Sequence, residues 1–240
     1  MSRSIQADLD RPIWTALTTK QANLGYGDAL ARRYHPDVAP FAALASETPA
    51  SYQALRQLLL PGEQVVLQSE ELIEPIHGLQ MTYLGALHQM VARSRDADGT
   101  NEREFIRLSS DDVNDMLDLV QKTRPGPFGK RTREMGNYIG IRERGRLIAM
   151  AGERMHVGGY VEISAVCVDE DHRGKGLAGR LVKVLCREIG QRGETPFLNV
   201  FSNNVAAIGL YQRLGFELRR EFHLTRIGHA DPHSAFPESA

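Results

Sequence analysis

The sequence predicts a mixed α/β fold, with its main domain over residues 103–228. Apolar residues at helical spacing alternate there with short β-rich runs, in the order βαβββαβαβ. Three consecutive strand patterns are joined by short turns that contain glycine, which implies an antiparallel meander. Because a sheet with helices on both faces would bury all of these apolar stripes, we expect that arrangement.

Composition places the chain among ordinary soluble globular proteins. Its 240 residues, 42% hydrophobic and 25% charged, suit one large domain or two small ones. A formal net charge of −1 gives no field that would attract nucleic acid or an anionic membrane. No apolar run approaches the roughly 20 residues of a membrane span, and the first residues hold no signal-peptide core. We therefore expect a cytoplasmic protein with neither nucleic acid nor membrane as a partner.

The two cysteines indicate neither a disulfide framework nor a zinc site. Cys167 lies in an apolar strand pattern and Cys186 in a helix pattern, so we expect both to be buried and reduced. A catalytic cysteine is the alternative. The eight histidines show no metal-ligand spacing, and we expect no metal.

Residues 1–100 form a predicted N-terminal domain of unclear role. A helix is predicted over Ser51–Leu60, capped by its first residue, and a strand follows at 65–67. Apolar residues at helical spacing between Met81 and Val91 predict a second helix. The polar run 93–104 then marks the boundary with the main domain.

In the main domain each element follows from its local pattern. Cap and first-turn acids at Ser109–Asp112 precede a helix that must stop before Pro125. The loop Thr123–Gly129 is either a connector or a wall of a substrate pocket. Strands are predicted at 105–108, 138–142, 147–155, 160–168 and 197–201, with one or two more within 216–227, and helices at 113–120, from 177 to about 190, and at 204–214. We expect the tail, residues 229–240, to be disordered.

The stretch Val166–Ala178 carries the clearest functional signal. A strand pattern runs into a glycine-rich turn, and a helix opens at Leu177, so unpaired N–H groups of the helix start could hold an anion. Two glycines let the backbone approach a ligand and two cations add positive charge; these are Arg173, Gly174, Lys175 and Gly176. The alternative is an ordinary strand-to-helix turn. Walker and Rossmann glycine patterns are absent from this sequence.

A second motif, N-x-x-A-x-x-x-Y, follows at Asn204–Tyr211. Together with the turn at Arg173–Ala178 it resembles the GCN5-related N-acetyltransferase (GNAT) superfamily, in its FR47-like subgroup. The acyl-CoA signature R/Q-x-x-G-x-G/A of this family falls on Arg173, Gly176 and Ala178. The resemblance covers about residues 103–228 and implies a mixed, mostly antiparallel sheet flanked by helices. It does not reach residues 1–100, for which a degenerate GNAT-like half is one hypothesis.

The resemblance implies acetyl-CoA as acyl donor and no metal. In this family the strand that ends at Val168 separates from the strand at 197–201, the pantetheine arm lies in the gap, and the pyrophosphate takes the amides of the turn. The implied cofactor-binding residues are Val166, Cys167, Val168, Arg173, Gly174, Lys175, Gly176, Leu177, Ala178, Asn204 and Ala207.

The implied reaction is transfer of acetyl to a primary amine by direct attack in a ternary complex. Tyr211 is the candidate acid for the departing thiolate, and the amide near Val168 is the candidate oxyanion donor. Glu162 is the candidate base, acting directly or through water. Tyr211 could instead be a packed aromatic, and Glu162 could face solvent or be held in a salt bridge. Strict alternation places Glu162 on the face of Val166, but a bulge would change that parity.

We expect the acceptor to be a small-molecule or peptide amine. A homodimer is left open. The alternative function is a non-catalytic acyl-CoA-binding or regulatory module, since residues 1–100 could cover the acceptor side.

Overall fold

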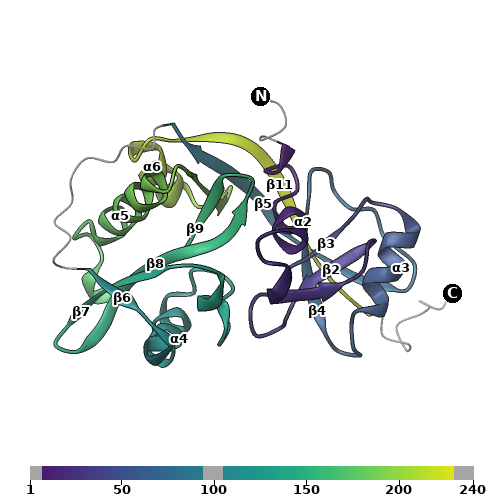
Figure 1. The fold of residues 1–240 in the computed structure, drawn as a ribbon, viewed down its shortest axis with the longest axis horizontal. Coiled ribbons are helices and arrows are strands. Elements are labelled where there is room, and N and C mark those ends of the chain that lie inside the picture. Colours follow the sequence, from purple (N-terminus) through teal and green to yellow (C-terminus); the bar gives the residue numbers. More distant parts are fainter. Residues whose placement is uncertain (1–6, 94–104, 230–240) are drawn as a thin grey trace, which may run out of the picture.

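The computed structural model describes residues 7–93 and 105–229 (Figure 1). Nearly all of the predicted boundary run, and all but the first residue of the predicted disordered tail, lie outside these ranges. None of the described helices is both long enough and apolar enough to cross a membrane.

One eight-stranded sheet runs through both halves of the molecule, in the order β4-β11-β5-β10-β9-β8-β7-β6. Its neighbouring strands are antiparallel except for β9 and β10, which are parallel. The mixed, mostly antiparallel sheet expected from the family resemblance is therefore confirmed. The strands are β4 (Gln64–Ser69), β5 (Leu79–Ala92), β6 (Ile106–Leu108), β7 (Tyr138–Glu143), β8 (Arg146–Val157), β9 (Tyr160–Val168), β10 (Thr195–Phe201) and β11 (Phe216–His229).

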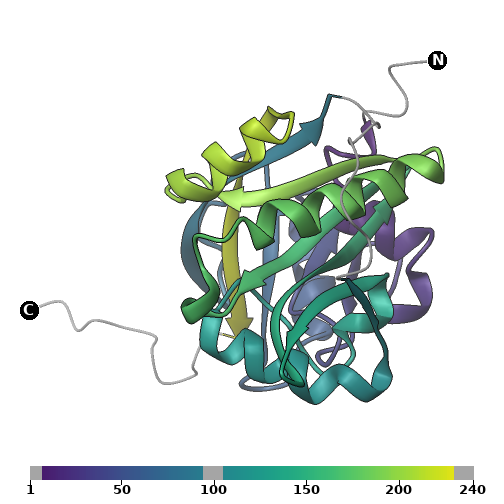
Figure 2. The ribbon, with the colours of Figure 1, turned by 90° about the vertical axis from the view of Figure 1, so that its left-hand side faces the viewer.

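Three α-helices complete the predicted order of the main domain: α4 (Val113–Thr123), α5 (Leu177–Gln191) and α6 (Val205–Arg213). The capping box of Ser109 and Asp112 starts the short 3₁₀ turn η3 that leads into α4, and α4 ends before Pro125 as predicted. α5 and α6 share one core with one face of the sheet, whereas α4 packs in a separate core on the other face. Figure 2 shows α5 and α6 toward the top of this half and α4 at its bottom.

The first half of the chain builds a smaller unit around a three-stranded antiparallel sheet. Thr48, and not Ser51, caps its helix α3, because the Thr48 side chain accepts a hydrogen bond from the Ser51 N–H at 3.3 Å. Pro49 at the first helical position explains the earlier start, since its fixed φ suits a helix N-terminus. The elements are α2 (Pro12–Thr18), η1 (Ala22–Leu24), β1 (Gly25–Gly27), β2 (Ala31–Tyr34), β3 (Ala42–Leu44) and α3 (Pro49–Gln57).

The helix predicted between Met81 and Val91 is wrong, because these residues lie within strand β5. β5 is paired on both sides, with β10 over five residues and with β11 along most of its length. Two neighbouring strands satisfy the backbone N–H and C=O groups of β5. These long-range contacts outweigh the local helical spacing of its apolar residues.

The sheet crosses the predicted domain boundary. β4 and β5 precede that boundary in sequence, yet both pair with β11 of the main domain. Figure 1 shows β5 and β11 running side by side from the half that carries α5 to the half that carries α3. A shared core joins Leu9, Tyr34 and Phe41 of the first half to Met155 and Phe197 of the second. The division at about residue 100 and the duplication hypothesis stay predictions.

A β-bulge in β9 changes which residues share a face. Ala165 has φ 52°, and the register with β8 shifts beside it. Val161 and Ile163 pack toward α5, whereas Cys167 packs toward α4. Glu162 and Val166 therefore lie on opposite faces of the sheet, as a bulge between them requires.

Candidate active site

The parallel strands β9 and β10 pair over three residues only. The ladder joins Tyr160–Glu162 to Thr195–Phe197 and stops there, although β9 continues to Val168 and β10 to Phe201. The predicted separation of these two strands is thus present. The edge of β9 beyond Glu162 is left unpaired on the β10 side, so its backbone groups can bond a ligand in the gap.

The glycine turn after β9 presents free amides. Gly174 and Gly176 have φ of 77° and 74°, a left-handed conformation that favours glycine. Gly176 is the N-cap of α5 and gives the helix no side-chain cap. Among the described backbone hydrogen bonds outside regular elements, none is donated by Gly174, Lys175 or Gly176. Buried Leu177 holds the helix start against the core, so these N–H groups and the positive helix end are available to an anion.

The cations of this turn are exposed and only weakly held. Arg173 reaches the Glu170 carboxylate at 3.3 Å, with more than half of each side chain in solvent. Lys175 is exposed as well. Both side chains can therefore swing to an anion on the turn at little cost in free energy.

α6 lies against the first turn of α5. A Cβ built on Gly179 would lie 3.4 Å from Leu210 Cδ1, which places the two helices in contact. Asn204 is the N-cap of α6, and its Oδ1 accepts the Ala207 N–H at 3.2 Å. The structure thus gives Asn204 and Ala207 a capping role; their predicted place beside pantetheine stays a prediction.

Tyr211 lies near the C-terminal end of α6. Its side chain is half-buried against the core that α5 forms with one face of the sheet. Its ring meets the Phe216 ring edge-on, with centroids 6.1 Å apart. Burial raises the pKa of the Tyr211 phenol to about 12. The hydroxyl therefore keeps its proton at neutral pH, as a general acid must.

Glu162 is held in an ion pair, which is the alternative that the sequence left open. Arg154 on β8 binds both carboxylate oxygens, Nε to Oε2 at 2.8 Å and Nη2 to Oε1 at 2.6 Å. Asn199 Nδ2 on β10 also donates to Oε1, at 2.8 Å. Glu162 is fully buried and lies where the β9–β10 ladder ends.

Two aromatic residues surround this ion pair, and the sequence analysis missed both. Arg154 lies 4.9 Å from the centroid of the Phe41 ring. Burial raises the pKa of the Tyr138 phenol, which also feels the charges of Arg154 and Glu162. Two buried atoms here have no partner among the described residues, namely the Tyr138 hydroxyl and Asn199 Oδ1. The sequence did contain one signal of this buried site, because the charged pair Glu153-Arg154 stands inside an apolar strand pattern.

The loop Thr123–Gly129 lies beside these residues. Phe128 meets the Tyr138 ring edge-on at 5.6 Å. Just after the loop, the Arg131 N–H donates to the Asp37 carbonyl at 2.9 Å, which ties the segment to the first half of the chain. One residue of the loop thus packs on Tyr138, and a place for the loop in the wall of a substrate pocket stays a prediction.

Both cysteines are free and buried, as expected. Burial raises the pKa of the Cys167 thiol to about 11 and that of Cys186 to about 12. Neither thiol is activated as a nucleophile at neutral pH. Among the described residues, no group of three or more His, Cys, Asp or Glu side chains is placed to hold a metal ion.

The fold and the site define an α/β protein in which a glycine turn with free amides lies beside an open strand pair. The family model for FR47-like proteins matches residues 138–225. A crystal structure described as a GNAT-family acetyltransferase from Novosphingobium aromaticivorans DSM 12444 is 35% identical, with a TM-score of 0.86 over 93% of this chain and 99% of that one. The chain therefore belongs to the GNAT family.

More distant relatives differ in how much of the chain they share. A GCN5-related N-acetyltransferase from Kribbella flavida covers 98% of each chain with a TM-score of 0.66 at 15% identity, a likeness of fold alone. The spermine/spermidine N(1)-acetyltransferase of Bacillus subtilis is 35% identical over 26% of this chain and 43% of that relative. The ribosomal protein bS18-alanine N-acetyltransferase of Escherichia coli K12 is 28% identical over 52% of this chain and 89% of that relative. This chain spans less than half the length of the first of these curated relatives.

Proposed function

We propose that the protein transfers an acetyl group from acetyl-CoA to a primary amine in a ternary complex, without a metal. The observation that carries the proposal is the gap where β9 and β10 separate, next to the uncapped N-terminus of α5. The pyrophosphate would take the amides of Gly174 to Ala178. The pantetheine arm would bond the unpaired backbone of β9 around Val166, Cys167 and Val168.

The reaction needs an acid, an oxyanion donor and a base. Tyr211 is the proposed acid for the departing thiolate, because its phenol stays protonated at neutral pH. The amide near Val168 is the proposed oxyanion donor. Glu162 remains the proposed base. Because Arg154 and Asn199 already donate three hydrogen bonds to its carboxylate, Glu162 would accept the proton of the amine through a water or after one of these partners has moved away.

The acceptor side is the face that carries Glu162 and the Thr123–Gly129 loop. A carboxylate and the unpartnered Tyr138 hydroxyl would suit a protonated amine there. The named relatives act on a polyamine and on an alanine of a ribosomal protein, both of which present amines. Spermidine and a peptide with N-terminal alanine are therefore the first acceptors to try. The cytoplasm as location, and a monomer or homodimer as the assembly, stay predictions.

Calorimetry and turnover test this proposal together. We expect a saturable heat of binding with acetyl-CoA and release of free CoA thiol when a suitable amine is added. Glu162→Gln should lower kcat if Glu162 is the base, while acetyl-CoA affinity stays unchanged. If millimolar acetyl-CoA produces neither a heat nor a thermal shift, the proposed function is wrong.

A non-catalytic acyl-CoA-binding module is the second candidate. The Glu162 ion pair favours it, because both oxygens of this carboxylate already accept hydrogen bonds from Arg154 or Asn199 and neither is free to take a proton from an amine. The packing of Phe41 onto Arg154 also brings the first half of the chain over this face. Acetyl-CoA binding without transfer to any member of a broad panel of amines and peptides would favour this candidate.

A further inference from the structure

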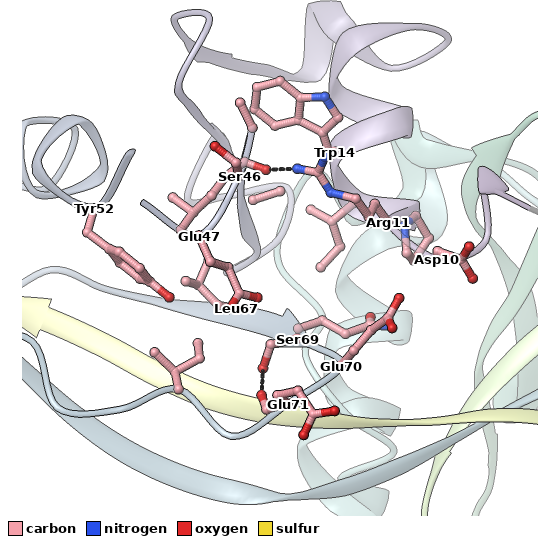
Figure 3. Close-up of a pocket in the computed structure, with 17 residues that line it drawn as sticks. Asp10, Arg11, Trp14, Ser46, Glu47, Tyr52, Leu67, Ser69, Glu70 and Glu71 are labelled. Atoms are coloured by element: carbon pink, nitrogen blue, oxygen red, sulfur yellow. Dashed lines mark hydrogen bonds between the residues drawn. The ribbon is translucent and has the colours of Figure 1, made fainter. Parts of the chain in front are cut away.

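A cavity lies in the first half of the chain, apart from the turn proposed to bind acetyl-CoA (Figure 3). Its volume is about 350 Å³, within the range of small-molecule sites. The walls come from α2, the end of β3 and the residues after it, α3, and the end of β4. None of the residues proposed for acetyl-CoA binding or catalysis lines it.

One part of the wall is hydrocarbon. Ile13 and Trp14 of α2 line the cavity together with Leu67 of β4 and Ile73. The Trp14 indole and the side chain of Leu67 are both among the lining groups in Figure 3. A ligand with an aliphatic stem would bury that stem here.

The wall also carries more negative than positive charge. Asp10 is bound by Arg219 and Arg220, and Glu70 by Arg220. Glu47 and Glu71 also line the cavity. Within the described part of the chain, neither of these two carboxylates has an ion-pair partner, so a cation would find two unpaired charges.

Arg11 is the cation among the described residues of the wall, and it is already engaged. Its guanidinium donates to the Leu44 carbonyl and lies 5.5 Å from the centroid of the Trp14 ring. Within the described ranges it forms no ion pair with Glu47 or Glu71. An added cation would not have to displace it.

Tyr52 provides a polar group that lacks a partner. Only 7% of this residue is exposed, and its hydroxyl points toward the middle of the lining residues in Figure 3. No hydrogen bond joins that hydroxyl to another of the described residues. The hydroxyl oxygen is not among the fully buried atoms without a partner, so it is open to the cavity and can bond a ligand there.

We propose that this cavity is a second ligand site, which binds a small aliphatic ammonium compound. The ammonium group lies with the Glu47 and Glu71 carboxylates and donates to the Tyr52 hydroxyl. The hydrocarbon stem lies on Trp14 and Leu67. This inference does not depend on the proposed acetyl transfer, because the two sites share no residue.

Trp14 makes the test direct, because it is the single tryptophan of the chain. Without acetyl-CoA present, cadaverine should change the Trp14 emission in a saturable way, and added salt should weaken the effect. Pentanediol, which has the same length and no charge, should produce no change. The idea fails if cadaverine gives no saturable response at millimolar concentration, or if pentanediol gives the same one.

Variants locate the site. Glu47→Gln or Glu71→Gln should each raise the Kd for cadaverine about tenfold, as the loss of a charge-assisted hydrogen bond implies. Tyr52→Phe should raise it about threefold. Asp118→Asn removes an exposed charge on α4 and should leave the Kd unchanged. Equal losses in Asp118→Asn would overturn the proposal. Acetyl-CoA calorimetry on the same samples shows separately whether the first site is intact.

Discussion

Arg154 and Glu162 form a bidentate ion pair in which the glutamate is fully buried and the arginine side chain is 11% exposed. The pair links neighbouring strands β8 and β9, and Asn199 extends it to β10. It therefore ties together three strands at the point where β9 and β10 begin to separate.

Arg154→Met should lower the free energy of unfolding by about 3–5 kcal/mol, because it leaves the Glu162 charge buried without its partner. Urea unfolding measures the loss. The control is Arg131→Met, whose pair with Glu134 is exposed by about two fifths on each side and should be worth less than about 1 kcal/mol. Similar losses in the free energy of unfolding would show that the buried Arg154–Glu162 pair stabilises the fold no more than an exposed pair does.

Gly176→Val should weaken acetyl-CoA binding by about tenfold or more, since the left-handed backbone and the proposed close approach of phosphate both exclude a branched side chain. Gly62→Val is the matched control. Gly62 has φ 83°, and a Cβ added to it would, as at Gly176, meet no heavy atom within 4 Å. Both variants should lose similar stability, and calorimetry should show weaker binding only for Gly176→Val. Equal acetyl-CoA affinities in the two variants would show that the turn is not part of the binding site.

Tyr211→Phe should reduce kcat by at least about a hundredfold with little change in acetyl-CoA affinity, because the acid is lost and the ring is kept. The pKa of about 12 means that the phenol stays protonated up to about pH 10, so its ionisation should not lower the wild-type kcat in that range. The control, Tyr83→Phe, alters an exposed tyrosine of β5 and should leave kcat unchanged. Unchanged turnover in Tyr211→Phe would exclude Tyr211 as the acid.

Glu153 should contribute to acid unfolding. Burial opposes its ionisation, but hydrogen bonds from His156 and Arg192 outweigh that effect and hold the pKa of the carboxyl below 4.5. A depressed pKa adds stability that is present above the unfolded value and is lost as pH falls through the folded one. Glu153→Gln should therefore unfold with a shallower dependence on pH below about 4.5.

The control for the acid experiment is Glu134→Gln. The pKa of Glu134 is also lowered by Arg131, but that pair is exposed and screened by solvent. Glu134→Gln should leave the pH dependence of the unfolding midpoint nearly unchanged. A wild-type pH profile in Glu153→Gln would contradict the assignment.

Cys167 and Cys186 should resist thiol reagents in the folded protein. Their burial and raised pKa values leave almost no accessible thiolate near neutral pH. Ellman's reagent should therefore react slowly without denaturant and titrate both thiols in urea. Rapid reaction of either cysteine in the native state would show that its strand or helix opens locally.

The sequence predicted the main domain well because its elements have strong local signals. The caps before α4, the glycine turns of the meander and the apolar stripe of α5 act over a few residues each. The turn at Gly174 and Gly176 is also a local signal, since glycine itself favours the left-handed backbone that these two residues adopt before the helix.

The first half of the chain was harder to predict because its elements depend on distant partners. β5 has the apolar spacing of a helix, and its place between β10 and β11 makes it a strand. The predicted cap of α3 lies three residues too late, because Pro49 starts the helix ahead of its apolar face. The cavity of Trp14 and Tyr52 joins residues from α2, β3, α3 and β4, so no local pattern could reveal it.

The sequence alone thus determined the order of elements in the main domain, the glycine turn before α5 and the resemblance to one family, because those signals are local. Only the tertiary structure decided the surroundings of Glu162. The bulge at Ala165 and the ion pair with Arg154 depend on how β8, β9 and β10 pair, and strand register is a property of the folded sheet.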